Sequence, residues 1–185
     1  MGKIVQNRRL VAVVGASGAG KDTLLEGLVA ACPEVYRAHR TISRPPSANT
    51  EDFESVTLAE FDALHREGAF ALIWWAHGLG YGIRHCELDP LAEGRTVVFN
   101  GSRKALPEAV ARYPDLRVVM VSVMPEVLAA RLTARGRETA ADIARRLERA
   151  DTELPAGIVG QVVRNDGTRE EGIARLIAAV QPVSA

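Results

Sequence analysis

Residues 9–23 read RLVAVVGASGAGKDT, and this stretch decides the fold. Its first part, RLVAVV, is a short apolar run of the length expected for a buried strand, and leucines at helical spacing follow from Lys21 onward. The segment between them, GASGAGKDT (15–23), matches the G-x-x-x-x-G-K pattern of phosphate-binding loops. A strand before the loop and a helix after it form the context in which this pattern predicts binding of a nucleotide's phosphates.

The glycines and the lysine of this P-loop each have a physical role in phosphate binding. Gly15, Gly18 and Gly20 allow backbone angles that other residues resist, so successive amide N–H groups can point inward around phosphate oxygens. Lys21 supplies positive charge for the β- and γ-phosphates, and the N-terminus of the following helix adds a partial positive charge. A glycine-rich turn that only connects strand and helix is the alternative, and the complete spacing disfavours it. The predicted ATP-binding residues of the loop are Gly15, Ala16, Ser17, Gly18, Ala19, Gly20, Lys21, Asp22 and Thr23.

One position of the loop departs from the pattern. The residue after the lysine is normally Ser or Thr, whose hydroxyl binds Mg²⁺, but here it is Asp22. A carboxylate is a hard oxygen ligand that suits Mg²⁺, either directly or through a water molecule. Thr23 lies about 100° further round the helix and is a poorer substitute. We therefore predict that Asp22 is the residue that binds Mg²⁺.

Length and composition indicate one globular domain. The chain has 185 residues, of which 47% are hydrophobic and 25% charged, so disordered, collagen-like and coiled-coil classes are excluded. Its 23 basic and 23 acidic residues give a formal net charge of zero. A neutral chain is not expected to bind nucleic acid or an anionic membrane by bulk electrostatics. Any charged partner is expected to be small.

Cysteines, histidines and apolar runs indicate neither a metal site nor a secreted protein. Cys32 and Cys86 have no disulfide or metal-ligand spacing, and the four histidines (39, 65, 77 and 85) are scattered. No apolar run is long enough for a signal peptide or a membrane span. We expect a cytoplasmic protein.

Short apolar runs alternate with helical patterns along the rest of the chain. This alternation predicts an α/β fold with an open, mainly parallel sheet. Two capping boxes, Thr57 with Glu60 and Thr168 with Glu171, predict where two of the helices start. The predicted strands are 9–14, 70–76, 95–100, 116–123 and 160–166, and the predicted helices are 21–31, 58–67, 103–113, 125–135, 140–152 and 169–180. The polar, proline-containing stretch 39–55 is long for a loop, which indicates function or mobility.

Arginines are concentrated between Leu128 and Asp151. This segment holds six arginines against four acidic residues, and Arg131 and Arg135 are four positions apart on one helix face. Phosphoryl transfer requires cations around a transferring group whose charge spreads over its oxygens. A solvated, salt-bridged helix pair would be an equally good interpretation of this segment alone. A P-loop in the same chain favours a catalytic role.

The motifs together resemble the guanylate kinase family over nearly the whole chain. They are GASGAGKDT, TISRPP with Glu51, VTLAEFDALHREGAF, HGLGYG, LAARLTARGRETAADIARRLERA and RND, in this order. The resemblance implies a three-layer P-loop nucleoside-monophosphate-kinase fold in a single domain. It implies a core formed by 8–35, 91–125 and 153–182, a small acceptor-binding lobe at 36–90 and a helical lid at 126–152.

Roles for individual residues follow from the same resemblance. In the family, the residues that match Lys21, Arg135 and Arg146 bind ATP phosphates, and those that match Arg44 and Tyr81 hold the acceptor phosphate. The residue that matches Asn165 lies near the adenine. Together with the charge argument above, this gives four expected catalytic residues: Lys21, Arg131, Arg135 and Arg146.

Three departures from the family pattern disfavour guanine as the acceptor. Ser47 stands where a second arginine is expected, Leu72 where a glutamate reads guanine, and Asn100 where aspartates are expected. Leaving the donors of a buried purine unpaired would cost about 1–3 kcal/mol each.

GKD, HRTISRP, WAHGLGYG, NGSR and NDG resemble instead the members of this family that act on a ribose bisphosphate in phosphonate breakdown. That resemblance implies Mg²⁺-dependent transfer of the γ-phosphoryl group of ATP to the 1-phosphate of ribose 1,5-bisphosphate, which yields 5-phosphoribosyl 1-diphosphate. The expected acceptor-binding residues are Arg40, Arg44, Glu51, Tyr81, Asn100 and Arg103. Arg84 lies in the same region, and for Arg40, Arg84 and Arg103 a surface role is an equally good interpretation. A guanylate kinase and a non-catalytic interaction module remain the alternatives.

Overall fold

The computed structural model describes residues 9–45, 52–134 and 153–181. Its large sheet is entirely parallel, with the strand order β2-β7-β1-β8-β9. The strands are β1 (Arg9–Gly15), β2 (Val35–Arg37), β7 (Thr96–Asn100), β8 (Arg117–Ser122) and β9 (Gln161–Arg164). Four of them coincide with predicted apolar runs, and β2 was not predicted. The parallel sheet confirms the expected α/β class.

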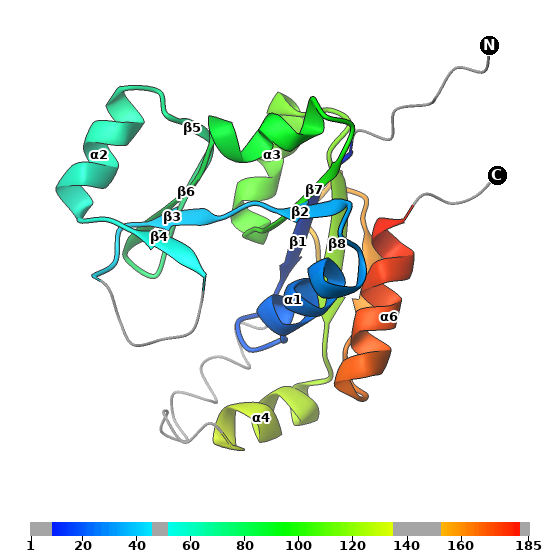
Figure 1. Cartoon of the computed structure of the whole chain (residues 1–185). Helices are drawn as coiled ribbons and strands as arrows, with labels where there is room; N and C mark the ends of the chain where they lie inside the picture. The colour runs from blue at the N-terminus through cyan, green and yellow to red at the C-terminus, as the bar shows by residue number, and fades with distance from the viewer. Residues whose placement is uncertain (1–8, 46–51, 135–152, 182–185) are drawn as a thin grey trace, which may run out of the picture.

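A second, four-stranded sheet has the order β4-β3-β6-β5 and lies beside the first (Figure 1). Its strands are β3 (Arg40–Ile42), β4 (Phe53–Ser55), β5 (Phe70–Ala76) and β6 (Leu79–Arg84). β5 and β6 form an antiparallel hairpin whose turn, His77-Gly78, has positive φ at both residues (54° and 75°). The predicted strand 70–76 therefore belongs to this sheet. The stretch 39–55 holds two short strands, which the interpretation as a long loop did not include.

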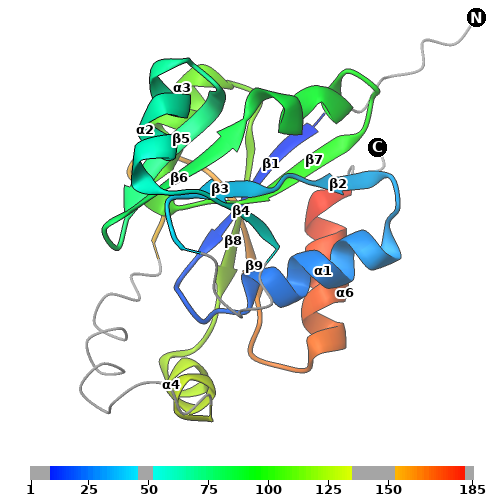
Figure 2. The ribbon, with the colours of Figure 1, turned by 60° about the vertical axis from the view of Figure 1, so that its left-hand side comes forward.

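Helices cover both faces of the large sheet. α1 (Lys21–Ala31) and α6 (Arg169–Val180) lie side by side on one face (Figure 2), and both have the predicted bounds. The predicted helix 103–113 is a 3₁₀ turn, η2 (Arg103–Ala105), followed by α3 (Leu106–Arg112) on the other face. α2 (Leu58–Arg66), η1 (His85–Leu91) and α4 (Pro125–Ala134) complete the described elements. The predicted helix 140–152 lies outside the described residues.

The side chains of the central strand β1 point alternately to the two faces of the sheet and so belong to two separate cores. Val11 and Val13 point to the α1–α6 face and pack with Leu24, Leu28 and Leu176. The intervening β1 residues point the other way, where they pack with α3 and with Leu72, Trp74 and Ile83 of the small sheet. The second core thus joins the small sheet to the large one.

Both predicted capping boxes are confirmed. Thr57 caps α2 and Thr168 caps α6, and in each the glutamate at the third helical position returns the hydrogen bond. Among the described residues no helix is long and apolar enough to cross a membrane.

Candidate active site

The P-loop joins β1 to α1 at the edge where the parallel strands end, which is where ligands bind in open α/β sheets. Gly18 and Gly20 both have a φ of 90°, and Gly20 caps the start of α1. The Nζ atom of Lys21 donates to the carbonyls of Gly15, at 3.0 Å, and Ala16, at 2.9 Å. The lysine side chain therefore folds back over the loop and brings its charge to the loop's centre.

Two elements pack against the loop from outside. A Cβ atom at Gly20 would lie 2.6 Å from Nδ2 of Asn165, and one at Gly18 would lie 3.0–3.1 Å from Leu128 and Leu132 of α4. Asn165 is 5% exposed and donates through Nδ2 to the carbonyl of Ala19 at 2.7 Å. Asn165, which the resemblance placed near the adenine, therefore supports the loop through its amide.

α4 also brings Arg131 to the loop. Its Nη1 atom lies 4.0 Å from the position of a Cβ atom at Gly20. Arg131 is thus beside the backbone of the loop, and its catalytic role stays a prediction. Arg135 and Arg146 lie outside the described residues.

Asp166 ties the start of α4 to the end of β9. Its carboxylate accepts from the amide of Met124, at 2.5 Å, and from Nε of Arg164, at 2.8 Å. Partial desolvation raises the pKa of Asp166, but these hydrogen bonds and the charges of Arg164 and Arg131 outweigh it, so the pKa is lowered. The carboxylate is therefore held in its charged form at neutral pH.

Asp22 is the centre of a charged cluster at the start of α1. Its Oδ1 atom accepts from Nη2 of Arg37 at 2.6 Å, and Nη2 of Arg40 lies 3.6 Å away. Nδ2 of Asn100 lies 3.0 Å from Oδ1 and 3.1 Å from Oδ2. The two arginine side chains are only 12% exposed, and Asp22 is 31% exposed. Segments from β2, β3 and β7 thus converge on this carboxylate.

Sequence reasoning did not identify Arg37. The residue ends a strand of three residues, which is too short to show a pattern, and its role depends on a partner 15 positions away. A basic side chain shortly before the predicted Arg40 was the one signal available. Asn100 was predicted to bind sugar hydroxyls, and its amide N–H groups here bind Asp22.

The predicted acceptor residues Arg44 and Tyr81 come from neighbouring strands of the small sheet. Ile42 of β3 pairs with Tyr81 of β6, and Arg44 follows two residues after Ile42. The guanidinium carbon of Arg44 lies 4.5 Å from the ring centre of Phe53, and the Tyr81 ring stacks on Trp74 at 5.6 Å. Aromatic contacts therefore orient both side chains.

The other predicted acceptor residues differ in their surroundings. The Nη1 atom of Arg103 is buried and has no hydrogen-bond partner among the described residues. Arg84 is paired with Glu54, with Nη2 2.5 Å from Oε1 and Nε 2.8 Å from Oε2. Glu51 lies outside the described residues. The ion pair with Glu54 thus holds Arg84 within the small sheet.

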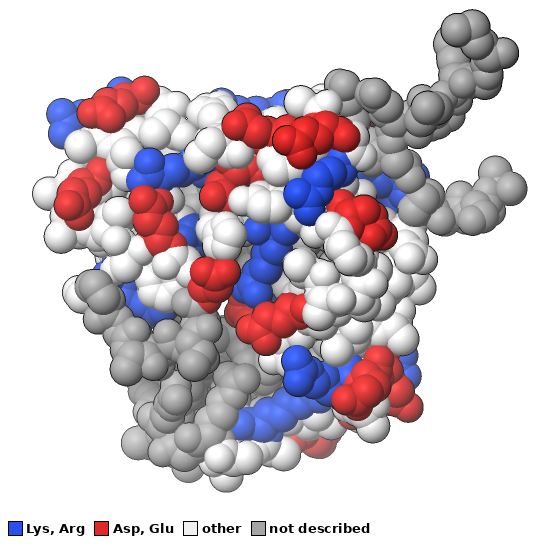
Figure 3. Space-filling view, in the orientation of Figure 1, with Lys and Arg blue, Asp and Glu red and all other residues white. Residues whose placement is uncertain are grey.

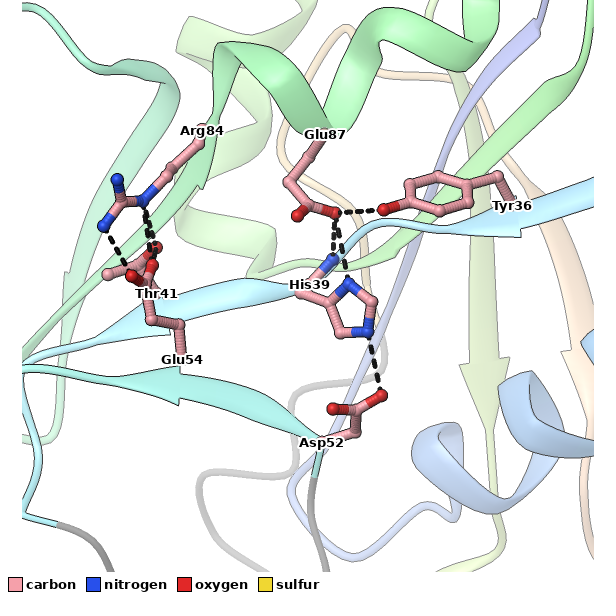
Figure 4. A network of polar contacts seen from close by, with 7 residues as sticks. All are labelled: Tyr36, His39, Thr41, Asp52, Glu54, Arg84 and Glu87. Atoms are coloured by element: carbon pink, nitrogen blue, oxygen red, sulfur yellow. Dashed lines mark hydrogen bonds and ion pairs between the residues drawn. The ribbon is translucent and has the colours of Figure 1, made fainter.

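A polar network lies between the small sheet and η1 (Figure 4). Oε2 of Glu87 accepts from the hydroxyl of Tyr36, at 2.9 Å, and from the amide of His39, at 2.7 Å. The ring of His39 contacts Glu87 with Nδ1, at 3.3 Å, and Asp52 with Nε2, at 2.9 Å. Thr41 donates to Glu54, which holds Arg84. A cavity of about 420 Å³ is lined by His39, Thr41, Asp52, Phe53, Glu54, Arg84 and Glu87.

Tyr36 is strongly affected by this network. Burial, the hydrogen bond to Glu87 and the charge of that carboxylate raise the pKa of the Tyr36 hydroxyl to about 12. Tyr36 is therefore a permanent hydrogen-bond donor in the physiological pH range, and it joins β2 to η1.

Charges of both signs are mixed on the face of the molecule seen in Figure 3, and no large area of one sign is visible there. Within the described ranges, no group of three or more His, Cys, Asp or Glu residues could hold a metal ion.

Comparisons with known proteins agree in sequence and in fold. The chain is 47% identical to ribose 1,5-bisphosphate phosphokinase PhnN from Ruegeria sp. (strain TM1040) over 175 residues, which cover 93% of this chain and 91% of the relative. It is 45% identical to ribose 1,5-bisphosphate phosphokinase PhnN from Thiobacillus denitrificans (strain ATCC 25259 / T1), over 96% of this chain and 95% of the relative. No family model matches.

Among solved structures, guanylate kinase from Anaplasma phagocytophilum is similar with a TM-score of 0.63 and 17% identity. The similarity covers 93% of this chain and 83% of that one. It confirms the predicted P-loop kinase fold.

Proposed function

The chain belongs to the ribose 1,5-bisphosphate phosphokinase family, and we propose that it phosphorylates ribose 1,5-bisphosphate with ATP to form 5-phosphoribosyl 1-diphosphate. The observation that carries this proposal is the convergence of a complete P-loop with Arg37, Arg40 and Arg131 at one edge of the sheet. Such an array of cations suits a reaction between two anions. The relatives' name PhnN fits a place in phosphonate breakdown.

The reaction moves one phosphoryl group. An oxygen of the 1-phosphate forms a bond to the γ-phosphorus of ATP, and the bond from that phosphorus to the β–γ bridging oxygen breaks, so ADP leaves. The attacking oxygen is already anionic, and no general base is required to activate it. The protein has to place two anions in line and to neutralise the charge on the transferring group.

We assign the donor side of this task to the P-loop and its neighbours. Lys21 would bind the β- and γ-phosphates, and Arg131 would lie along the transferring group. Arg135 and Arg146 are proposed as further cations of the same site. Arginine suits this role because its planar group can donate two parallel hydrogen bonds to a phosphate.

On the acceptor side, we assign the phosphates to Arg44 with Tyr81 and to Arg40. We add Arg103 as a further proposed contact of the acceptor, because its buried Nη1 atom has no hydrogen-bond partner among the described residues. Glu51 and Asn100 remain proposals for the sugar hydroxyls. Residues 36–90 would form the acceptor lobe and residues 126–152 a lid over a core formed by the rest.

A divalent metal ion, which we take to be Mg²⁺, would accompany ATP and neutralise its phosphates. The carboxylate of Asp22 fits direct metal ligation poorly, because Oδ1 faces two guanidinium groups and the amide of Asn100 contacts both oxygens. We therefore propose that Asp22 does not bind the metal ion directly, which departs from the sequence-based prediction. No step of the reaction above depends on a metal bond to Asp22.

GMP is disfavoured as the acceptor by the residue at the position where the family reads guanine. Leu72 is 5% exposed and packs in the second core. A leucine side chain also has no polar atom that could bind a purine.

The testing experiment offers ribose 1,5-bisphosphate and GMP in parallel, with ATP and Mg²⁺, and follows ADP formation and the phosphorus NMR spectrum. Formation of a diphosphate from the sugar, without turnover in the Lys21→Met variant, supports the proposed reaction. Faster turnover of GMP would assign the chain to guanylate kinase activity. No nucleotide binding at all would favour a non-catalytic module.

A further inference from the structure

The residue after the P-loop lysine is surrounded by cations rather than left open to a metal ion. Asp22 lies in the first turn of α1 and receives Arg37 from the large sheet and Arg40 from the small sheet. Asn100 at the end of β7 contacts both of its oxygens, at 3.0 and 3.1 Å. The carboxylate thus connects the nucleotide loop to both sheets.

The binding capacity of Asp22 is largely used by these contacts. Nδ2 of Asn100 is shared between both carboxylate oxygens, and Oδ1 also accepts from Arg37 at 2.6 Å, so both oxygens already have a donor. A metal ion bound directly to Oδ1 would also face two guanidinium groups within 3.6 Å of that atom. Positive charges gathered around one oxygen atom in a partly buried site repel one another.

The two arginines are well placed to bind a second anion. Each is only 12% exposed, so water screens its charge little. The side chains of Asp22, Arg37, Arg40 and Asn100 together carry a formal charge of +1. The contact of Arg37 with Asp22 uses Nη2 alone, and a guanidinium carries N–H groups on all three nitrogens.

The cluster lies at the start of the strand that leads to the proposed acceptor residues. Arg40 begins β3, the strand that leads through Ile42 to Arg44, and Ile42 pairs with Tyr81. A bisphosphate carries one phosphate more than a nucleoside monophosphate, and that phosphate needs its own cations. Arg44 with Tyr81 accounts for one phosphate only.

We propose that Arg37, together with Arg40, binds a phosphate of the sugar bisphosphate, and that Asp22 is a positioning residue for this arginine pair instead of a ligand of the metal ion. The assignment rests on the proposed function. It makes Arg37 a residue that determines acceptor specificity, and it explains an acidic residue where the motif has a hydroxyl.

The test compares steady-state kinetics of Asp22→Ser, Arg37→Met and Arg37→Lys with the wild type. Asp22→Ser restores the residue that the P-loop pattern specifies. Arg66→Met removes an exposed arginine of α2 whose Nε donates to the carbonyl of Asp62 in the same helix, and it serves as the matched control. Each variant is measured for the KM of ribose 1,5-bisphosphate, the KM of ATP, kcat, the Mg²⁺ concentration at half activation and the thermal unfolding midpoint.

We expect Arg37→Met and Asp22→Ser to raise the KM of the sugar bisphosphate about tenfold or more, as the loss of a charge-assisted hydrogen bond predicts. The KM of ATP and the Mg²⁺ midpoint should stay close to wild-type values. A raised Mg²⁺ midpoint in Asp22→Ser, with an unchanged KM for the sugar, would make Asp22 a metal ligand and overturn the assignment.

Arg37→Lys covers the case in which the other variants fail to fold. It keeps the charge facing Asp22 but loses the planar donor fork, so it should fold and still raise the KM of the sugar. An unchanged KM in this folded variant would overturn the role of Arg37. If the wild type does not turn over ribose 1,5-bisphosphate, the proposed function fails, whereas an active wild type with unaffected variants refutes only the arginine assignment.

Discussion

At the scale of single residues, the site depends on side chains whose polar partners come from distant parts of the chain. Asp22 is held by arginines 15 and 18 positions further on and by Asn100, 78 positions away. Asn165 supports Ala19 across 146 positions. Each side chain looks ordinary in the sequence and gains its role from the fold.

Tyr36 provides a prediction at this scale. Its pKa is raised from 10.0 to about 12, chiefly by burial and then by the hydrogen bond to Glu87. We expect an ultraviolet titration of the folded protein to show one tyrosine that ionises near pH 12, and Tyr36→Phe to remove that step. Because the folded state holds this proton more tightly, its contribution to stability is complete below pH 10 and is lost as the pH rises toward 12.

The unfolding midpoints of wild type and Tyr36→Phe should therefore converge over that alkaline range. A difference in unfolding midpoint that stays constant up to pH 12 would show that the pKa of the Tyr36 hydroxyl is not raised by folding.

At the scale of elements, the strand–loop–helix unit that binds phosphate was predictable because its signal is local. The β1 run, the glycine spacing and the leucines of α1 are contiguous, and the bounds of α1 agree with the prediction. The small sheet was not predictable in the same way. Its β3 and β4 strands have three residues each, and strand pairing joins segments far apart in sequence.

β6 was missed for a different physical reason. Its sequence, LGYGIR, contains two glycines, which normally weaken a strand. In the fold, the ring of Phe61 packs against Gly80, and the ring of Phe70 packs against Gly82, where a Cβ atom would collide. The glycines therefore make room for aromatic side chains, a requirement that only the packed structure reveals.

The P-loop itself gives a prediction at the element scale. Gly20→Ala would place a methyl group 2.6 Å from Nδ2 of Asn165 at a φ of 90°, so both packing and backbone would be strained. We expect this variant to lose most of its ATP affinity, measured by calorimetric titration. The phosphate-binding amides would no longer converge.

Gly157→Ala is the matched control for this experiment. Gly157 has a similar φ of 80°, but a Cβ atom there would meet nothing within 4 Å. Its backbone cost of about 1 kcal/mol should lower stability and leave ATP binding intact. Equal losses of ATP affinity in both variants would contradict the proposed packing effect.

At the scale of the whole molecule, stability and the site are linked by contacts between α4 and β9. Asp166 joins the amide of Met124 to the end of β9, next to the residue that supports the P-loop. Hydrogen bonds and the charges of Arg164 and Arg131 lower its pKa against the opposing effect of desolvation. The folded state therefore binds this proton more weakly than the unfolded state.

Asp166→Asn should accordingly destabilise the protein by about 1 kcal/mol at neutral pH, the size of one net hydrogen bond. The contribution of Asp166 is present above the usual carboxyl pKa of about 4 and is lost as the pH falls through the lowered value. Urea unfolding at a series of pH values measures the free energy of unfolding of both proteins. The wild type and Asp166→Asn should have the same free energy of unfolding in acid. A difference that persists in strong acid would point to a steric cause.

The join between β2 and β3 has a mechanical consequence. Arg37 closes a strand of one sheet, Arg40 opens a strand of the other, and only Ala38 and His39 separate them (Figure 1). Ala38 is buried and its amide donates to Val98, so this link is anchored to the large sheet. This short, anchored link limits how far Arg40 can move away from Arg37, because a fully extended chain spans at most about 3.6 Å per residue. A tether of this length keeps both arginines at the boundary between the two sheets.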